Sequence, residues 1–337
     1  MIRRREFITL LGGVAAWPVV AHAQQSVKVH RIAIVHPSAA VADMTETSEY
    51  PAFPALFTEL RRLGYIEGRN LVVDRHSGEG RQGNFANLAR NVIRARPDVV
   101  IASSNPLVLA FKEITDTPIV GAMSDPIAYG IAASLSRPGG NITGISVDAG
   151  LEIWGKRLQI LREAVPTAKT IGFLTSQTAW SQLQAGETGP MREAARQLGL
   201  LIVGPPLGQF ADQNEYRRVL GAMVAAGANA LIVSDYALNA PHRRLIVDFA
   251  ETAKLPALYP FHEYFEVGGL MSYGSSIAAF YVRIAGYVDK LLQGVRAAEM
   301  PIFQETKFDL SINLKVASSL GLTIPTSLLL RADKVIE

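Results

Sequence analysis

The chain has 337 residues, of which 49% are hydrophobic and 19% are charged, and its formal net charge is +3. This length suits about two domains, and so large a hydrophobic fraction excludes an intrinsically disordered chain. The absence of cysteine excludes disulfide bonds, iron–sulfur clusters and thiol catalysis. The basic residues are scattered after the first few positions, so nucleic acid is not an expected partner.

The first 23 residues have the three-part pattern of an export signal. A basic start at Arg3–Arg5 is followed by an uncharged segment over residues 9–21 and by the small-residue cleavage site Ala21–Ala23. The pair Arg4-Arg5 ahead of Phe7-Ile8 favours the twin-arginine export route. The uncharged segment is shorter than the roughly 20 residues that span a bilayer. We therefore expect a periplasmic protein whose signal is cleaved near Ala23.

The next part of the chain alternates β-branched runs with amphipathic patterns, which is typical of an α/β fold with a parallel sheet. Apolar residues recur at helical spacing over residues 85–93. The run Ser103–Pro106 predicts the start of a further helix, because serine and asparagine cap helices and proline suits the first turn. Strands are predicted at Arg31–Val35, Leu71–Val73, Val99–Ala102 and Thr117–Val120.

The second half repeats this order of elements. Helices are predicted over residues 191–198, 216–224 and 245–249, and a long amphipathic helix over residues 277–292. One more strand is predicted at Phe308–Ile312. The other strands of the second half are predicted at Ile171–Leu174, Leu200–Val203, Ala230–Val233 and Leu255–Tyr259.

This duplication predicts two Rossmann-like lobes with parallel sheets joined by a hinge. The glycine-rich and asparagine-containing loop Arg137–Gly144 is the expected boundary. We expect lobe 1 to hold residues 28–144 plus about 273–300, and lobe 2 to hold residues 145–272 plus about 301–337. Ligands of open α/β sheets bind outside the carboxyl ends of the strands. Two such lobes can therefore close on a ligand between them.

Six runs give the chain a resemblance to a known family, and together they are specific and cover nearly the whole chain after the signal. They are Leu63–Asn70, Ser136–Gly144, Gly268–Gly274, Tyr287–Lys290, Leu320–Pro325 and Arg331–Glu337. The chain resembles the ABC-transporter substrate-binding proteins of the tryptophan/tyrosine-type group, which have the type I periplasmic binding protein fold. The resemblance implies capture of a small solute and its delivery to an inner-membrane permease. It implies no enzymatic activity and no cofactor, and we expect a monomer.

The chain departs from that family after its first strand. Residues 36–53 form a longer and more polar segment than the short turn usual in the family. We expect this segment to rim the cleft, so the aromatic amino-acid specificity of the family does not transfer directly. An amino acid, preferably aromatic or branched, is the expected ligand, and a carboxylate without an ammonium group stays open.

Polar residues after the first-half strands are the first candidates for ligand binding. Ser103, Ser104 and Asn105 lie where a strand meets a helix N-terminus, which suits a ligand carboxylate. Plain helix capping is the alternative. Ser124 and Asp125 follow the next strand, where an ordinary Asx turn before proline is equally expected.

The second half supplies a candidate cation partner. Asp235 follows the strand that corresponds to the one before Ser103, and its carboxylate is expected to pair with a ligand ammonium, with helix capping as the alternative. Tyr236 and Trp180 are candidates to stack on a ligand ring, although packing is favoured for Trp180. Tyr273 is a candidate for the hinge or the site. Glu263 is a weaker candidate still.

The sequence gives weaker support to three other functions. The run Gly78-x-Gly80-x-x-Gly83, with Asp98 downstream, is the argument for an exported NAD(P)-type oxidoreductase. It follows the second predicted strand rather than the first, and Glu79 would lie beside the pyrophosphate. A hydrolase lacks support because the sequence has neither a G-x-S-x-G elbow nor a histidine pair for zinc, so no metal site is expected. A solute sensor for a membrane receptor would have the same fold.

Overall fold

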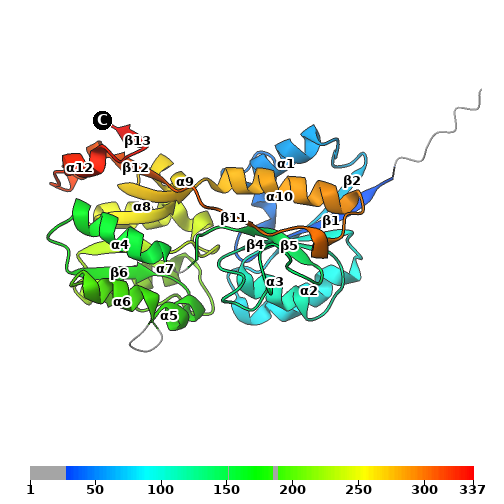
Figure 1. Ribbon diagram of the computed structural model, residues 1–337, viewed down its shortest axis with the longest axis horizontal. Coiled ribbons are helices and arrows are strands. Elements are labelled where there is room, and N and C mark those ends of the chain that lie inside the picture. Colours follow the sequence, from blue (N-terminus) through cyan, green and yellow to red (C-terminus); the bar gives the residue numbers. More distant parts are fainter. Residues whose placement is uncertain (1–27, 151, 185–188) are drawn as a thin grey trace, which may run out of the picture.

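The computed structural model describes residues 28–150, 152–184 and 189–337. The predicted export signal, residues 1–23, lies outside these ranges. The described residues form two sheets side by side, each covered by helices on both faces (Figure 1). No helix in the described ranges is long and apolar enough to cross a membrane.

The first sheet has six strands in the described ranges, in the order β11-β5-β4-β3-β1-β2, and all of its pairings are parallel. Helices α1 and α10 pack together on one face, and α2 and α3 pack together on the other (Figure 1). We call these elements the first lobe. Its strands are β1 (His30–His36), β2 (Leu71–Ser77), β3 (Val99–Ser103), β4 (Ile119–Met123), β5 (Ile142–Ser146) and β11 (Phe303–Gln304). Its helices are α1 (Ala52–Arg62), α2 (Phe85–Arg94), α3 (Asn105–Lys112) and α10 (Ile277–Leu292).

The second sheet has seven strands in the described ranges, in the order β13-β12-β10-β9-β8-β6-β7, and only the β10–β12 pairing is antiparallel. We call this sheet and its helices the second lobe. Its strands are β6 (Thr170–Leu174), β7 (Leu201–Val203), β8 (Ala230–Val233), β9 (Ala257–Phe261), β10 (Met271–Ser275), β12 (Asp309–Asn313) and β13 (Lys334–Ile336). Its helices are α4 (Ile153–Ala164), α5 (Gln177–Gln184), α6 (Pro190–Gln197), α7 (Gln213–Ala225), α8 (Arg243–Thr252), α9 (His262–Glu266), α11 (Leu314–Ser319) and α12 (Thr326–Leu329).

The described chain passes between the sheets three times, after β5, after β10 and after β11. These crossings differ from the expected lobe limits by a few residues. The limit at residue 144 would cut β5, but β5 stays in the first sheet because all five of its residues pair with β4. Phe303–Gln304 also joins the first sheet by pairing with β5, and Tyr273 lies in β10 of the second sheet.

One strand forms where the sequence indicated a loop. Gly144 lies within β5 opposite Gly121 of β4. Its φ is +132°, and a Cβ atom there would lie 2.1 Å from the Gly121 carbonyl oxygen. The residue is therefore a glycine that lets two strands approach closely, and not the loop glycine that the composition suggested.

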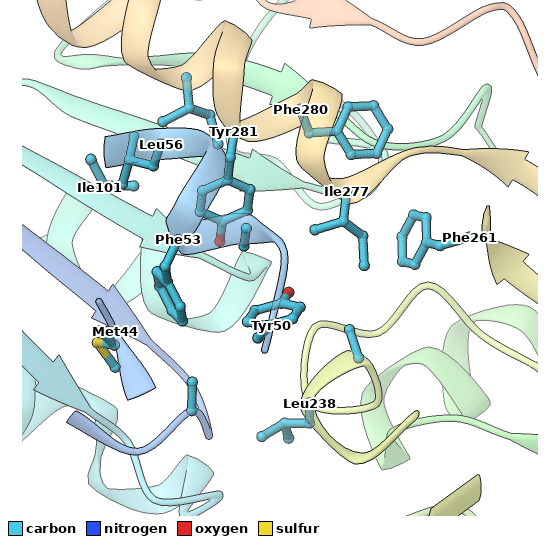
Figure 2. Close-up of a cluster of buried hydrophobic side chains, with 14 of the residues drawn as sticks. Met44, Tyr50, Phe53, Leu56, Ile101, Leu238, Phe261, Ile277, Phe280 and Tyr281 are labelled. Atoms are coloured by element: carbon cyan, nitrogen blue, oxygen red, sulfur yellow. The ribbon is translucent and has the colours of Figure 1, made fainter. Parts of the chain in front are cut away.

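The largest apolar cluster extends from the first lobe to the second. Figure 2 shows Phe53 of α1 and Tyr281 of α10 near Leu238 and Phe261 of the second lobe, with Tyr50 between them. Burial of a large apolar side chain contributes about 1.5–3 kcal/mol. Apolar packing therefore continues across the junction between the lobes.

Candidate functional site

A cavity lies between the lobes, at the carboxyl ends of strands from both sheets. It encloses about 1000 Å³ of space when its open mouth is included. The first lobe contributes the ends of β1, β3, β4 and β5, and the second lobe contributes the ends of β6, β8 and β9. This is the position expected for the ligand of two facing α/β sheets.

Seven of the nine predicted site residues line this cavity. They are Ser103, Ser104, Asn105, Ser124, Asp125, Asp235 and Tyr236. The other two predictions need correction, because Trp180 and Tyr273 do not line it. The Trp180 ring packs on Phe173, with 6.2 Å between ring centroids, and the Tyr273 ring packs near Phe308 at 5.9 Å.

The corner between β3 and α3 leaves one hydroxyl without a protein partner. The Ser103 hydroxyl lies 2.6 Å from the Tyr281 hydroxyl, and Asn105 exchanges two hydrogen bonds with the backbone of Ser124. The Ser104 side chain is 6% exposed, and its buried Oγ atom has no hydrogen-bond partner among the described residues. Ser104 makes no capping bond and has a φ of +130°. Such strain in a non-glycine residue is typical of functional sites.

Asp125 has a structural role that its sequence context allowed. Its Oδ1 atom accepts a hydrogen bond of 3.0 Å from the Ala128 backbone N–H, three residues on, rather than from the N–H two residues on that an Asx turn would use. Its φ of +36° also places it in a sparsely populated region. Asp125 therefore shapes the turn after β4, in addition to lining the cavity.

A second helix N-terminus reaches the cavity from the other lobe. Thr175 and Ser176 precede α5, and both line the cavity. The Ser176 hydroxyl accepts a hydrogen bond of 3.1 Å from the Ala179 N–H and so caps the helix. The buried Thr175 Oγ1 has no partner in the described part of the chain. Each lobe therefore presents a helix N-terminus and an unpaired hydroxyl, a combination that suits an anionic group.

Two carboxylates and one guanidinium, those of Asp148, Asp235 and Arg157, lie close enough together to act on one another electrostatically. Asp148, which follows β5 and is 3% exposed, accepts hydrogen bonds from the Asp125 N–H at 3.1 Å and from the Ser146 hydroxyl at 3.2 Å. Arg157 of α4 is 1% exposed, and its guanidinium lies 4.9 Å from the Trp154 ring centroid. The buried Oδ2 atom of Asp235 has no hydrogen-bond partner among the described residues.

The charges of this group do not balance, because it has two acidic side chains and one basic side chain. Burial, followed by the negative charge of Asp148, raises the pKa of Asp235 from 3.8 to about 7. Burial also raises the pKa of Asp148, against the effect of the backbone N–H groups that donate to it. Burial and then the charges of Asp235, Asp148 and Asp125 raise the pKa of Tyr129. The group formed by Asp148, Asp235 and Arg157 therefore favours an additional cation.

Sequence reasoning missed several lining residues, among them Asp148, Thr175 and Tyr129, whereas Tyr50 belongs to the segment 36–53 that was expected to rim the cleft. Asp148 follows a strand that was not predicted, so its position had no meaning in the sequence. Arg157, which does not itself line the cavity, lies among the buried residues of α4, a helix that was not predicted. Glu263 does not line the cavity. Instead it accepts hydrogen bonds from the Ser276 hydroxyl and the Ala278 N–H at the start of α10.

The glycine-rich run forms a contact between the lobes. The Gln82 N–H donates to the Gln209 carbonyl at 3.0 Å, and the Ala211 N–H donates to the Gly80 carbonyl at 3.2 Å. Gly80 has a φ of +74°, and a Cβ atom there would lie 3.0 Å from the Ala211 carbonyl oxygen. The run is therefore shaped for approach of the second lobe. No cluster of three potential metal ligands occurs in the described ranges.

Comparison with known proteins identifies the relatives of this chain. Residues 42–336 match the family described as ABC transporter substrate binding protein. A tyrosine-binding protein of Clostridioides difficile is 29% identical over 117 residues, which are 34% of this chain and 33% of that protein. The chain thus matches only about a third of the length of this curated relative.

Two solved structures resemble almost the whole chain. A conserved domain protein from Vibrio cholerae is 24% identical, with 91% of this chain and 100% of that chain covered and a TM-score of 0.77. The ABC domain in complex with L-Trp from Streptococcus pneumonia is also 24% identical, with 92% and 100% covered and a TM-score of 0.74. These likenesses confirm the predicted type I periplasmic binding protein fold.

Proposed function

The chain belongs to the ABC transporter substrate-binding proteins, and from this premise we propose that it captures an amino acid between its lobes and delivers it to an inner-membrane permease. One observation carries the choice of ligand. The cavity is lined by Asp235, whose Oδ2 atom is buried, and by residues at two helix N-termini, where the Ser104 and Thr175 hydroxyls have no hydrogen-bond partner among the described residues. An α-amino acid carries one cation and one anion on the same carbon, and so it offers a partner to each of these two kinds of group.

Asp235 is the carboxylate that receives the ligand ammonium. Asp148 already accepts hydrogen bonds from the Asp125 and Gly150 N–H groups and from the Ser146 hydroxyl. Asp235 Oδ2 has no such donor among the described residues. A ligand ammonium at this atom balances the second carboxylate of the group, and charge-assisted hydrogen bonds are the stronger kind.

The ligand carboxylate lies at the N-termini of α3 and α5, where it accepts hydrogen bonds from Ser104 and Thr175. Because these residues belong to different lobes, the ligand contacts both lobes at once only when they are together. A ligand that binds the closed arrangement better shifts the population toward it. The closed form then docks on the permease.

The remaining wall of the cavity is apolar and holds the ligand side chain. It includes Tyr50, Trp154, Phe261, Ile277 and Phe280. Aromatic rings on several sides favour an aromatic or branched side chain. Two relatives agree with this choice, since one is a tyrosine-binding protein and another was solved in complex with L-Trp. The export signal predicted at residues 1–23 supports action in the periplasm.

Calorimetry with three matched probes tests the proposal. L-Phenylalanine carries both charges, 3-phenylpropanoate lacks the ammonium, and phenethylamine lacks the carboxylate. We expect L-phenylalanine to bind at least ~10-fold more tightly than either analogue, because a hydrogen bond to a charged group contributes about 1.5–3 kcal/mol. Equal binding of 3-phenylpropanoate would contradict the assignment of Asp235.

Variants separate the two ends of the site. Ser104→Ala should weaken L-phenylalanine by ~10-fold and 3-phenylpropanoate by a similar factor, since both use the carboxylate end. It should leave phenethylamine unaffected. Asp43→Asn is the matched control, because Asp43 lies on an exposed turn outside the cavity. An equal loss for all three probes would mean that Ser104 supports the fold rather than the carboxylate.

A further inference from the structure

The polar segment between β1 and α1 places one aromatic ring in the cavity. We call residues 37–51 the β1–α1 loop. Tyr50 of this loop is 8% exposed and lines the cavity with Phe261, Ile277 and Phe280. Figure 2 shows Tyr50 between Tyr281 of the first lobe and Leu238 of the second. The Tyr50 ring therefore limits the apolar part of the cavity at the junction of the lobes.

Two aromatic residues of the first lobe pack against the Tyr50 ring. Tyr50 makes edge-to-face contacts with His36, at 5.6 Å between centroids, and with Phe53, at 5.4 Å. Its backbone N–H donates to the Ser48 hydroxyl at 3.0 Å. Earlier in the loop, Met44 is buried, and its carbonyl accepts a hydrogen bond of 2.7 Å from Arg75 of β2. The loop is thus fixed to its own lobe at its middle and near its C-terminal end.

The second lobe contacts the same ring and the neighbouring backbone through Arg243, the first residue of α8. The Arg243 side chain is 6% exposed, and its guanidinium donates to the Glu49 carbonyl at 2.6 Å. The guanidinium carbon lies 5.9 Å from the Tyr50 ring centroid, within the range of a cation–π contact. Because these contacts join different lobes, they form only when the lobes are together.

We propose that Tyr50 determines how large a ligand side chain the cavity accepts, and that Arg243 is the positioning residue that holds the Tyr50 ring in the closed arrangement. This inference rests on the proposed function, because it concerns the side-chain end of the same site. The physical reason is steric. A rigid ring at the end of an apolar pocket discriminates between side chains of different length, and its removal adds space that only a larger side chain fills.

The experiment is calorimetry with L-alanine, L-leucine, L-phenylalanine and L-tryptophan on wild type, Tyr50→Ala, Tyr50→Leu and Arg243→Lys. In Tyr50→Ala we expect the ratio of the Kd for L-alanine to that for L-tryptophan to rise by ~10-fold or more, as expected when a pocket gains room for apolar groups. Arg243→Lys should move the ratio in the same direction by a smaller factor, since lysine keeps the charge but lacks the planar fork.

Controls make the result decisive. Tyr65→Ala removes a tyrosine of the same lobe that does not line the cavity and whose hydroxyl bonds to Asp289, so it should leave the ratio unchanged. If Tyr50→Ala does not fold, Tyr50→Leu decides, because it keeps an apolar side chain in the cluster. An equal weakening of all four ligands in the Tyr50 variants would overturn the proposal. A wild type that binds none of the four would overturn the proposed function, and this inference with it.

Discussion

Asp235→Asn should stabilise the ligand-free protein while it weakens ligand binding. The substitution keeps the shape of the side chain and removes the excess negative charge. It leaves Asp148 and Arg157 as a balanced pair. The pKa of Asp235 in the folded protein is raised from 3.8 to about 7, so the folded state holds this proton more tightly than the unfolded state does. The free energy of unfolding therefore falls as the pH rises through this range.

The magnitude follows from that pKa. At 1.36 kcal/mol for each pKa unit, the unfavourable contribution above pH 7 has an upper bound of ~4 kcal/mol. Opening of the lobes hydrates the carboxylate and reduces this value, so we expect the variant to gain ~1–3 kcal/mol at pH 8. At pH 5 the folded protein carries the proton, and the gain should be clearly smaller.

Urea unfolding at pH 8 and pH 5, followed by tryptophan fluorescence, measures the gain. Calorimetry on the same variant should show an amino-acid affinity at least ~10-fold lower, the combination typical of a functional site. A variant that is less stable than wild type at pH 8, or equally stabilised at both pH values, would refute the reasoning. Asp148→Ala is the matched control. It should destabilise the protein, because it removes the acceptor for the Asp125 N–H and the Ser146 hydroxyl.

Three further predictions follow from the same geometry. Amino-acid affinity should fall as the pH drops below about 7, because the ligand ammonium competes with the proton on Asp235. Calorimetry in buffers of different ionisation enthalpy should detect proton release on binding. A binding reaction that releases no proton would count against pairing of the ammonium with Asp235. Gly80→Val should speed ligand dissociation several-fold in stopped-flow measurements, because its Cβ would lie 3.0 Å from the Ala211 carbonyl oxygen, whereas Gly64→Val, at a positive φ with open space, should not. The radius of gyration should decrease when a saturating amino acid is added, and an unchanged value in X-ray scattering would argue against closure of the lobes.

The strands and helices with strong local patterns were predictable from the sequence. The buried strands β1, β3, β6 and β8 and the long helix α10 lie at the predicted positions, because their hydrophobic periods are written into neighbouring residues. The strand β5 was not predictable in this way. Its Gly144 has the composition of a loop, and only the pairing with Gly121 of a neighbouring strand makes it part of a sheet.

Part of the site was also determined by the sequence alone. Ser104 and Asp235 were predicted because polar residues that follow buried strands lie at the carboxyl edge of a parallel sheet, and both line the cavity. Trp180 satisfied the same pattern, but the structure packs its ring on Phe173 instead. A residue's place after a strand is a local property, whereas the direction of its side chain depends on what packs beside it.

The charge balance of the cavity was decided only by the tertiary structure. Asp148 follows a strand and Arg157 lies in the next helix, whereas Asp235 follows a strand of the other lobe and is distant from both in sequence. Each is unremarkable alone, since an exposed carboxylate keeps its ordinary pKa. Folding takes Asp148, Arg157 and the Oδ2 atom of Asp235 out of water together. Two acidic side chains then face one basic one in this group, and burial makes the cost of each charge depend on its neighbours. The sequence determined the two-lobed fold and the edge of the sheets where the cavity lies, while the packing between lobes decided which polar groups of the described residues remain without a partner there.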